Sequence, residues 1–316
     1  MNNFKKVGLT ALAGSLIATS AYAGEMSVTG GASIEMKNNS GSSGGKGWAM
    51  GNQLTFSGSG ELDNGLNVSL SFVIDQGDNE IDVDTDGSEA PFDSHSVTVS
   101  SDTLGSLVFS GEGGSSAQTA LDTTAAGDIW DNGFGISSPS ASDSGDNSML
   151  YTLPSLMDDL TLKAGYYPGR AGNDSATSWS ATYAGVDGLS VSYGFGEDAT
   201  IGSEADVTTM KGSYAMGSFT VALSQSEYDS DSGNDDEVSS YKLSYTMTED
   251  LSLSYGAETH ETEGSATDEE VSAITASYTT GGMTVTVASV EAEGVDHTAG
   301  VAGDKERWKV AASFAF

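Results

Sequence analysis

The sequence lacks cysteine and is poor in basic residues. Without cysteine, it can form neither disulfide bonds nor thiolate metal sites. Only 11 of its 316 residues are Lys or Arg, against 46 Asp and Glu, which gives a formal net charge of −35. Because phosphate contacts need patches of Lys and Arg, this imbalance excludes nucleic acid as a partner.

Long hydrophobic runs are also missing beyond the N-terminus. No stretch after residue 23 approaches the roughly 18 apolar residues that a membrane helix needs. Residues 1–23 resemble a cleaved signal peptide, with Lys5 and Lys6, an apolar run, and Ala21-Tyr22-Ala23 before Gly24. We therefore expect export across the inner membrane and cleavage after Ala23. The mature chain then has nine basic residues against the 46 acidic ones, a formal charge of about −37.

Catalytic and cofactor motifs are absent as well. The three histidines, His95, His260 and His297, lie far apart and lack the spacing of zinc ligands. The glycine-rich stretch 111–114 is too short for a phosphate-binding loop and lacks a following helix. Acidic pairs occur throughout so acidic a chain, and their pairing therefore does not indicate catalysis. We expect no enzymatic activity and no cofactor.

The last ten residues, 307–316, alternate between an apolar and a polar face. One face carries Trp308, Val310, Ala312, Phe314 and Phe316, and the other carries Arg307, Lys309, Ala311, Ser313 and Ala315. Successive side chains of a strand point to opposite faces, so this is the pattern of a strand with an aromatic face. An aromatic face at a chain end suits contact with lipid better than contact with water.

Similar alternation continues along the chain and predicts an all-β fold. About sixteen segments have this character: Met26–Met36, Trp48–Leu62, Leu66–Ile74, Ser94–Ser100, Ser106–Gly111, Ser148–Leu153, Leu160–Tyr167, Ser178–Ala184, Leu189–Phe195, Val207–Tyr214, Phe219–Tyr228, Ser239–Met247, Leu251–Glu258, Val271–Tyr278, Met283–Ala292 and Lys305–Phe316. Low hydrophobicity with high charge is also typical of disorder, but a disordered chain has no reason to alternate. Strands with a polar inner face suit a barrel that encloses water.

The connections between these segments alternate in length. Short ones carry turn residues, for example Asp63-Asn64-Gly65 and Val186-Asp187-Gly188. Long ones are acidic, for example 75–93, 229–237 and 291–304. Short turns at one rim and long loops at the other are typical of outer-membrane barrels. We therefore predict a transmembrane up-and-down antiparallel β-barrel that spans residues 24–316 as one domain.

The scarce cations test this assignment of faces. When the apolar residues of each strand are placed outward, six basic residues fall on the inner face: Lys37, Lys163, Lys211, Lys242, Arg307 and Lys309. A cation on the lipid face costs about 2–4 kcal/mol at the bilayer midplane, so a barrel would hold its cations inside. A solvated face of a soluble sheet is the alternative explanation.

One long connection, from Glu112 to Asn147, interrupts the rhythm. It contains Leu121, Ile129, Trp130, Phe134 and Ile136, more apolar residues than a surface loop usually carries. We expect this third long loop to fold into the barrel, where four of its acids would face the inward cations across a constriction: Glu112, Asp122, Asp128 and Asp131. A surface loop with a small hydrophobic cluster is the other interpretation.

The whole chain resembles the general diffusion porins of Gram-negative bacteria, most closely those of marine alphaproteobacteria. The resemblance rests on the signal at Ala21-Tyr22-Ala23, the sixteen segments, the long third loop and the terminal Phe316. It implies a homotrimer in the outer membrane, one pore per subunit for ions and small hydrophilic solutes, and recognition of Phe316 by the barrel-assembly machinery. The Pro-Glu-Phe-Gly-Gly motif of the enterobacterial loop is absent.

Two other functions fit parts of the sequence. A secreted acidic β-protein could bind calcium or glycans, and Asp82 to Asp93 has the start of a calcium loop but strands on both sides. Loose calcium binding at this loop or at Asp229, Asp231, Asp235 and Asp236 stays open. A sugar-specific channel would need an inward aromatic ladder, whereas the inward positions are mainly Ser, Thr and Gly, with Tyr167 as the chief exception.

Overall fold

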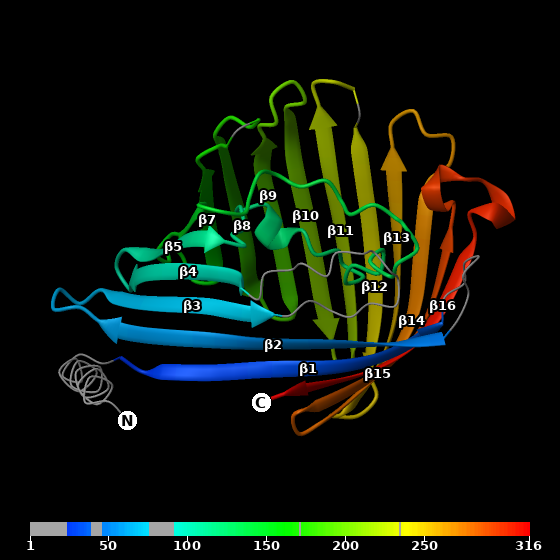
Figure 1. The fold of residues 1–316 in the computed structure, drawn as a ribbon, viewed down its shortest axis with the longest axis horizontal. Helices are drawn as coiled ribbons and strands as arrows, with labels where there is room; N and C mark the ends of the chain where they lie inside the picture. The colour runs from blue at the N-terminus through cyan, green and yellow to red at the C-terminus, as the bar shows by residue number, and fades with distance from the viewer. Residues whose placement is uncertain (1–23, 39–45, 76–91, 171, 234) are drawn as a thin grey trace, which may run out of the picture.

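The computed structural model describes residues 24–38, 46–75, 92–170, 172–233 and 235–316. Within them, sixteen strands form one closed barrel (Figure 1). The strands are β1 (Met26–Asn38), β2 (Lys46–Glu61), β3 (Asn67–Asp75), β4 (Phe92–Ser101), β5 (Gly105–Glu112), β6 (Met149–Thr152), β7 (Leu160–Tyr167), β8 (Ala176–Val186), β9 (Leu189–Asp198), β10 (Ala205–Met216), β11 (Phe219–Ser230), β12 (Asp236–Thr246), β13 (Leu251–Thr262), β14 (Glu269–Thr280), β15 (Met283–Glu293) and β16 (Lys305–Ala315).

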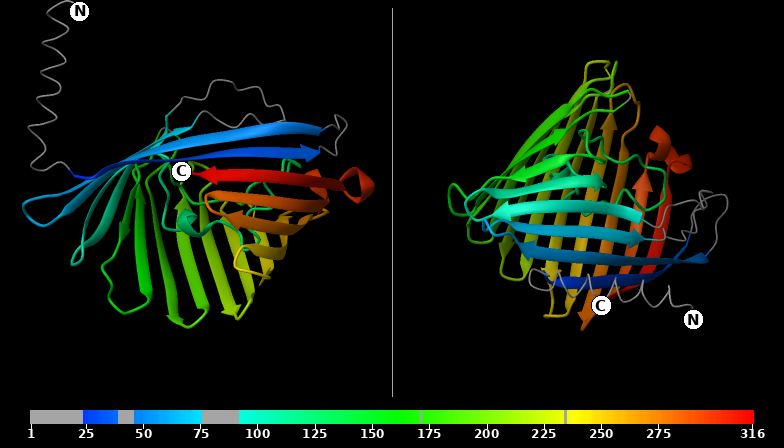
Figure 2. Two further views of the ribbon diagram at one scale, coloured as in Figure 1. Left: turned by 90° about the horizontal axis from the view of Figure 1, so that it is seen from below. Right: turned by 60° about the vertical axis from the view of Figure 1, so that its left-hand side comes forward.

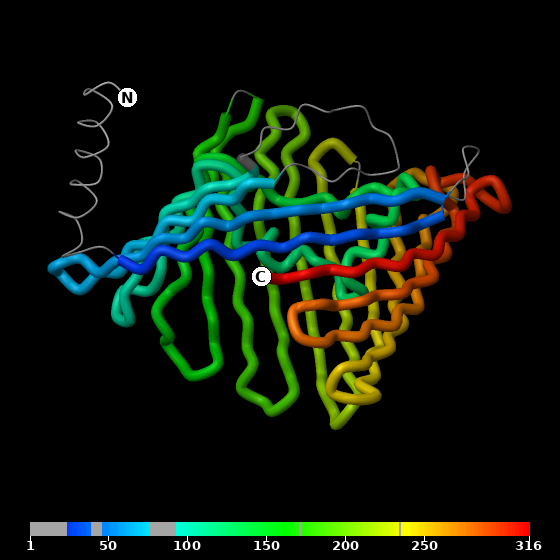
Figure 3. The backbone as a smooth tube through the Cα atoms, turned by 60° about the horizontal axis from the view of Figure 1, so that its bottom comes forward, coloured from blue at the N-terminus to red at the C-terminus, as the bar shows by residue number. Residues whose placement is uncertain are grey.

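Each strand pairs antiparallel with the next strand in the chain, and β16 closes the ring on β1. The closing register places Gly31 opposite Ala315 and Lys37 opposite Lys309. Two backbone hydrogen bonds between Gly30 and Phe316, of 2.8 and 3.0 Å, extend the seam to the last residue. Figures 2 and 3 show β16, in red, between β1 and β15. The predicted up-and-down antiparallel barrel is thereby confirmed.

The two rims differ in the length of their connections, as the sequence predicted. At one rim, two-residue turns join β8 to β9, β10 to β11 and β14 to β15. Gly188 and Gly217 have φ of 73° and 59° in two of these turns, a conformation that glycine adopts without the strain other residues meet. The other rim carries the longer connections, including the one of residues 113–148 between β5 and β6, hereafter the β5–β6 loop.

Apolar side chains cover the outer face of the barrel. On β12, Tyr241 and Leu243 are each 46% exposed, whereas Ser240 on the opposite face is 5% exposed. Neighbouring strands bring outer aromatics together, as for Phe219 and Tyr245, whose ring centres lie 4.8 Å apart. Because side chains alternate along each strand, an apolar outer face leaves the polar set on the inner wall.

The described residues contain little helix. Three short 3-10 turns occur, at Thr119–Leu121, Val295–His297 and Gly300–Ala302. Among the helices of these described ranges, none is long or apolar enough to cross a membrane. The strand ends differ from the predicted ends by a few residues, and β6 is shorter than expected, with only Met149–Thr152.

A cluster of buried apolar residues lies between the β5–β6 loop and the wall. Phe134 and Ile136 of the loop pack against small and β-branched residues of β14 and β15, and Ile129 and Trp130 lie at the edge of the cluster. The wall residues of this cluster are Val271, Ala273, Ala288, Val290 and Ala292. This apolar contact positions the loop for the polar contacts described next.

Candidate functional site

The β5–β6 loop follows the inner wall and is bonded to it strand by strand. Four wall hydroxyls take part, one on each of four strands: Ser178 of β8, Thr209 of β10, Ser224 of β11 and Ser240 of β12. Each forms a 2.8 Å hydrogen bond with the loop, at Ala117, Gln118, Ala125 and Ala126 in the same order. The order of the contacts shows that the loop crosses these strands in sequence along one side of the barrel (Figure 1).

Glu258 of β13 continues this series with a carboxylate in place of a hydroxyl. Its Oε1 accepts hydrogen bonds from the Thr124 hydroxyl and, at 3.1 Å, from the Ile129 N–H. Its Oε2 accepts the Trp130 N–H at 2.9 Å. The side chain is fully buried, and His260 lies 3.7 Å from Oε2. A buried carboxylate needs such donors, because the loss of water is otherwise uncompensated.

Gln118 holds the first part of the loop. Its amide nitrogen donates to Thr209, and its amide oxygen accepts two hydrogen bonds from Ser142, at 3.0 Å from the backbone and 2.8 Å from the hydroxyl. Gln118 is wholly buried, so it ties two distant parts of the loop and the wall together.

Three of the predicted wall cations lie beside this loop. Lys211 donates a hydrogen bond to the Thr123 carbonyl. The Lys242 ammonium lies next to Gly127, 3.7 Å from where a Cβ would be. Arg307 is 4% exposed, and its Nη2 lies 3.5 Å from the Gly133 carbonyl.

The other three cations lie on β1, β7 and β16. Lys37 and Lys309 are opposite each other across the β1–β16 seam, and both lie 3.6 Å from the carboxylate of Glu35. Lys163 pairs in register with the buried Ser180 on the inner wall. Within the described residues, Lys163 makes no hydrogen bond or ion pair.

The predicted loop acids occupy different environments. Glu112 ends β5 and lies 3.8 Å from His95, so it contacts a rim histidine. Asp122 and Asp128 both lie near the charge of Lys211. Asp128 also accepts a 2.8 Å hydrogen bond from the Thr124 N–H, and Asp131 is exposed.

The environment of Asp122 alters its acidity. Partial burial raises the pKa of Asp122 above its ordinary value, and the nearby Asp128 raises it further. Lys211 and the backbone N–H groups of Asp122 and Thr123 oppose this rise. Asp122 therefore releases its proton less readily than an exposed aspartate does.

The arrangement of charges differs from the one expected from the sequence. We expected the acids to face the cations across an opening, but Lys211, Lys242 and Arg307 lie on the wall to which the loop is bonded. The physical reason is that partly buried loop acids are stabilised most by cations in direct reach. Glu112 is likewise paired with His95 rather than with one of the six cations.

Sequence reasoning missed Glu258, Gln118 and Glu35. Glu258 and Glu35 were detectable as acids at inward positions of predicted strands, among Ser, Thr and Gly. Nothing in the sequence pointed to Gln118 as a site residue, because glutamine is common in polar loops. The distances that join Gln118 to β10 depend on the closed barrel.

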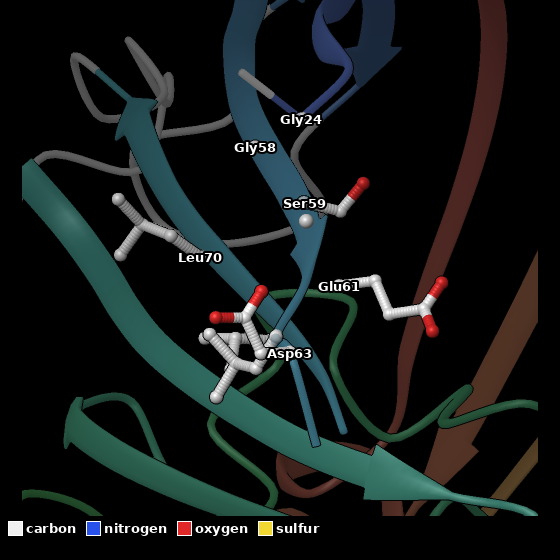
Figure 4. Close-up of a pocket in the computed structure, with 9 residues that line it drawn as sticks. Gly24, Gly58, Ser59, Glu61, Asp63 and Leu70 are labelled. Atoms are coloured by element: carbon white, nitrogen blue, oxygen red, sulfur yellow. The ribbon is translucent and has the colours of Figure 1, made fainter. Parts of the chain in front are cut away.

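One pocket lies at the site, and another lies away from it near the β2–β3 turn. A cavity of about 260 Å³ lies between loop and wall, lined by Thr124, Ser192, Lys211 and Ser213 among others. A second, of about 430 Å³, lies near the β2–β3 turn between Gly24, Ser59, Glu61 and Leu70 (Figure 4). Only the first touches the β5–β6 loop, and it contains a single cation among hydroxyls.

The described residues show no gathering of metal-binding side chains: no group of three or more His, Asp or Glu that could hold an ion occurs among them. The calcium-like segment beginning at Asp82 lies outside the described residues, apart from Phe92 and Asp93 at the start of β4. Asp235 accepts a 2.9 Å hydrogen bond from the Ser230 N–H, so one of the suggested calcium ligands is used within the β11–β12 connection.

The fold is similar to that of known porins. Three solved barrels superpose on most of the chain. They are Salmonella typhi OmpF in complex with daunomycin (TM-score 0.70, 12% identity, 93% of this chain and 98% of that one), an anion-selective porin from Comamonas acidovorans (0.65, 16%, 92% and 99%) and outer-membrane expressed OmpT of Vibrio cholerae (0.64, 17%, 93% and 98%). These likenesses show the fold.

A search of curated proteins found no match. The model of the Gram-negative porin family, in contrast, matches residues 8–316, nearly the whole chain. The closed barrel with an apolar outer face agrees with this match. The chain therefore belongs to the Gram-negative porin family.

Proposed function

We propose that solutes diffusing through this outer-membrane channel pass between the β5–β6 loop and the part of the wall that the loop leaves uncovered. The protein is a passive channel for ions and small hydrophilic solutes. The observation that carries the narrower proposal is the series of wall contacts from Ser178 to Glu258, which fixes the loop along one side of the barrel. A loop fixed in this way narrows the passage without closing it.

The charges at this narrow part are those of the loop and the wall. We assign Asp122, Asp128 and Asp131 to its acidic side, with Glu112 at the root of the loop. The basic residues are those of the inner wall: Lys211, Lys242 and Arg307 beside the loop, and Lys37, Lys163 and Lys309 elsewhere on the wall. Lys211 is offset by Asp122 and Asp128, and Lys37 and Lys309 share Glu35, so acidic neighbours weaken the positive charge of these cations.

This balance favours a mild preference for cations. The acids of the chain outnumber its bases about fourfold, and the long connections carry many of them. The test is single-channel conductance of the detergent-purified protein in a planar bilayer under a salt gradient. Ohmic steps with a small reversal potential on the cation side are expected, and a clear anion preference would refute the charge assignment.

We propose further that the channel works without catalysis and without a bound cofactor. Calcium would act only by loose bridging between acidic outer loops, beside which the carboxylates of Glu227 on β11 and Glu237 on β12 face each other in register. Conductance and selectivity should then be unchanged by a chelator. A loss of current on chelation, restored by added calcium, would show that a bound cation is required.

Assembly as a homotrimer completes the proposal. The family resemblance supports it, and so does the band of apolar side chains around the barrel, part of which a neighbouring subunit would cover. Conductance steps that arrive in threes, with slow migration of the unheated protein on a gel, are the expected outcome. Single steps from a protein that migrates as a monomer would contradict it.

A further inference from the structure

Glu258 differs from the other wall groups that hold the β5–β6 loop. Ser178, Ser224 and Ser240 each accept one hydrogen bond from a loop backbone N–H. Glu258 accepts three, from a hydroxyl and two backbone N–H groups, and it carries a charge. Hydrogen bonds to a carboxylate are about twice as strong as neutral ones. Glu258 therefore makes more hydrogen bonds to the middle of the loop than either Ser224 or Ser240, and it alone of these three bonds Ile129 and Trp130.

Glu258 contacts the loop between two other points of attachment, so it affects the position of the residues that lie between them. Gln118 fixes the loop to β10 on one side, and Phe134 packs on β14, β15 and Arg307 on the other. The segment between them contains Asp122, Asp128 and Asp131, the acids assigned to the narrow part. Release at Glu258 would loosen the part of this segment that follows Ala126, including Asp128 and Asp131, because Ser224 and Ser240 still bond Ala125 and Ala126.

The surroundings of Glu258 keep its carboxylate committed to the loop. The side chain has no exposed surface, so water cannot replace a lost loop donor. His260 stands 3.7 Å from Oε2, beyond hydrogen-bond range, and its Nε2 has no hydrogen-bond partner. The carboxylate thus receives its hydrogen bonds from the loop.

We infer that Glu258 is a positioning residue that sets the width of the channel by holding the middle of the β5–β6 loop against β13. The inference rests on the proposed passage between loop and wall. Glu258 itself does not contact the solute in this proposal. Its effect on permeation is exerted through Thr124, Ile129 and Trp130.

Substitution of Glu258 by Gln tests the inference. The amide nitrogen of Gln would replace the oxygen that accepts the Trp130 N–H, so two donors would face each other and this hydrogen bond would be lost. We expect single-channel conductance to rise at least about 1.5-fold, with faster current fluctuations, since current follows the narrowest cross-section. Glu269→Gln is the matched control: Glu269 is equally buried on the adjacent strand, but it bonds Asp296 and not the loop. Its conductance should equal that of the parent.

A covalent tether separates positioning from a general loss of structure. Ala126 and Gly256 face each other closely: a Cβ on Gly256 would be 2.9 Å from that of Ala126, so the loop has to move outward by about 1 Å to reach the roughly 3.8 Å of a disulfide. Because the chain has no cysteine, Ala126→Cys with Gly256→Cys adds the only thiols. Oxidation of this pair in the E258Q background should restore parental conductance, and reductant should reverse the rescue.

The outcomes are distinguishable. A parent that inserts but does not conduct would overturn the proposed passage itself. A conducting parent whose E258Q variant shows the same conductance and noise would overturn only the role of Glu258. Thr124→Val removes one donor to Glu258 and leaves the wall intact, and it also removes the acceptor of the Gly127 and Asp128 N–H groups within the loop. It gives the same test should E258Q not assemble into a heat-modifiable barrel, and parental conductance in T124V would then overturn the inference.

Discussion

The guanidinium carbon of Arg307 lies 5.2 Å from the centre of the Phe134 ring. This contact joins the β5–β6 loop to β16, the strand that closes the barrel on β1. Phe134 also belongs to the apolar cluster with Val271 and Val290. The same ring therefore makes apolar contacts and a cation–π contact with Arg307.

Replacing Phe134 by Ala should detach the part of the loop around Phe134 from β14, β15 and β16. Truncation of a buried Phe costs about 3 kcal/mol or more, while the strand pairing that holds the barrel is unaffected. We expect proteases to cleave the loop faster in the folded, detergent-solubilised protein. Phe109→Ala, on the outer face, is the control. Equal cleavage rates in F134A and the parent would show that the ring does not hold the loop.

Lys163 should influence ion selectivity. It is an inward cation without a hydrogen bond or ion pair among the described residues, so Lys163→Gln removes a charge that no neighbour offsets. At about 8 Å in water, one charge changes the energy of an ion by about 0.5 kcal/mol, which corresponds to about a twofold shift in permeability ratio towards cations. Reversal potentials in a salt gradient measure it.

The matched control for Lys163 is Lys46→Gln. Lys46 lies over the ring of Trp308, 5.7 Å from its centre, and that residue belongs to the outer face. The same change in net charge outside the lumen should leave the reversal potential unaltered. If K46Q and K163Q shift it equally, net charge rather than position determines selectivity.

Asp122 should take up its proton at a higher pH than an ordinary aspartate. Burial raises its pKa in the folded protein, so the ionised form opposes loop docking above that pKa, and the penalty disappears as the pH falls through it. Asp122→Asn should therefore strengthen docking at neutral pH and make no difference in acid. Lys211→Gln should raise the pKa of Asp122 further, because Lys211 lowers it.

A pH titration of the Asp122 carboxyl carbon by NMR, assigned by its loss in D122N, measures these pKa values. An Asp122 that titrates like an exposed aspartate would contradict the partly buried position. A lower pKa in K211Q would contradict the proximity of Lys211.

Phe316 should matter for assembly more than for the finished barrel. Its backbone bonds to Gly30, but its side chain is 72% exposed and adds little packing. We expect Phe316→Ala to reduce the amount of folded protein in the outer membrane several-fold, with normal heat resistance of the barrels that do form. Normal yield in the membrane would argue against recognition of the terminal aromatic. Mass spectrometry of the same material should find Gly24 as the first residue.

Much of the barrel could be predicted because its signals are local. Alternation along each strand, such as Tyr241, Leu243 and Tyr245 against Ser240 and Lys242, depends only on the two-residue period of a strand. Turn residues such as Gly188 and Gly217 mark the short rim for the same reason. The even number of strands and the identity of the long third loop followed from this reading.

The partners of the loop could not be predicted in the same way. Ser178, Ser224 and Ser240 are indistinguishable by type from the many other inward hydroxyls of the wall. Thr124 and Glu258 are 134 positions apart, and only the closed ring of strands brings them within hydrogen-bond range. The sequence also left open which side of the lumen the loop would follow.

The sequence by itself determined the class of the protein: an exported, acidic barrel with apolar residues outside and cations inside, since these properties follow from composition and local periodicity. The tertiary structure decided where the β5–β6 loop lies and which charges are neighbours. Lys211 beside Asp122 and Glu258 beneath Trp130 are contacts between distant segments, and their geometry exists only once β16 has closed on β1.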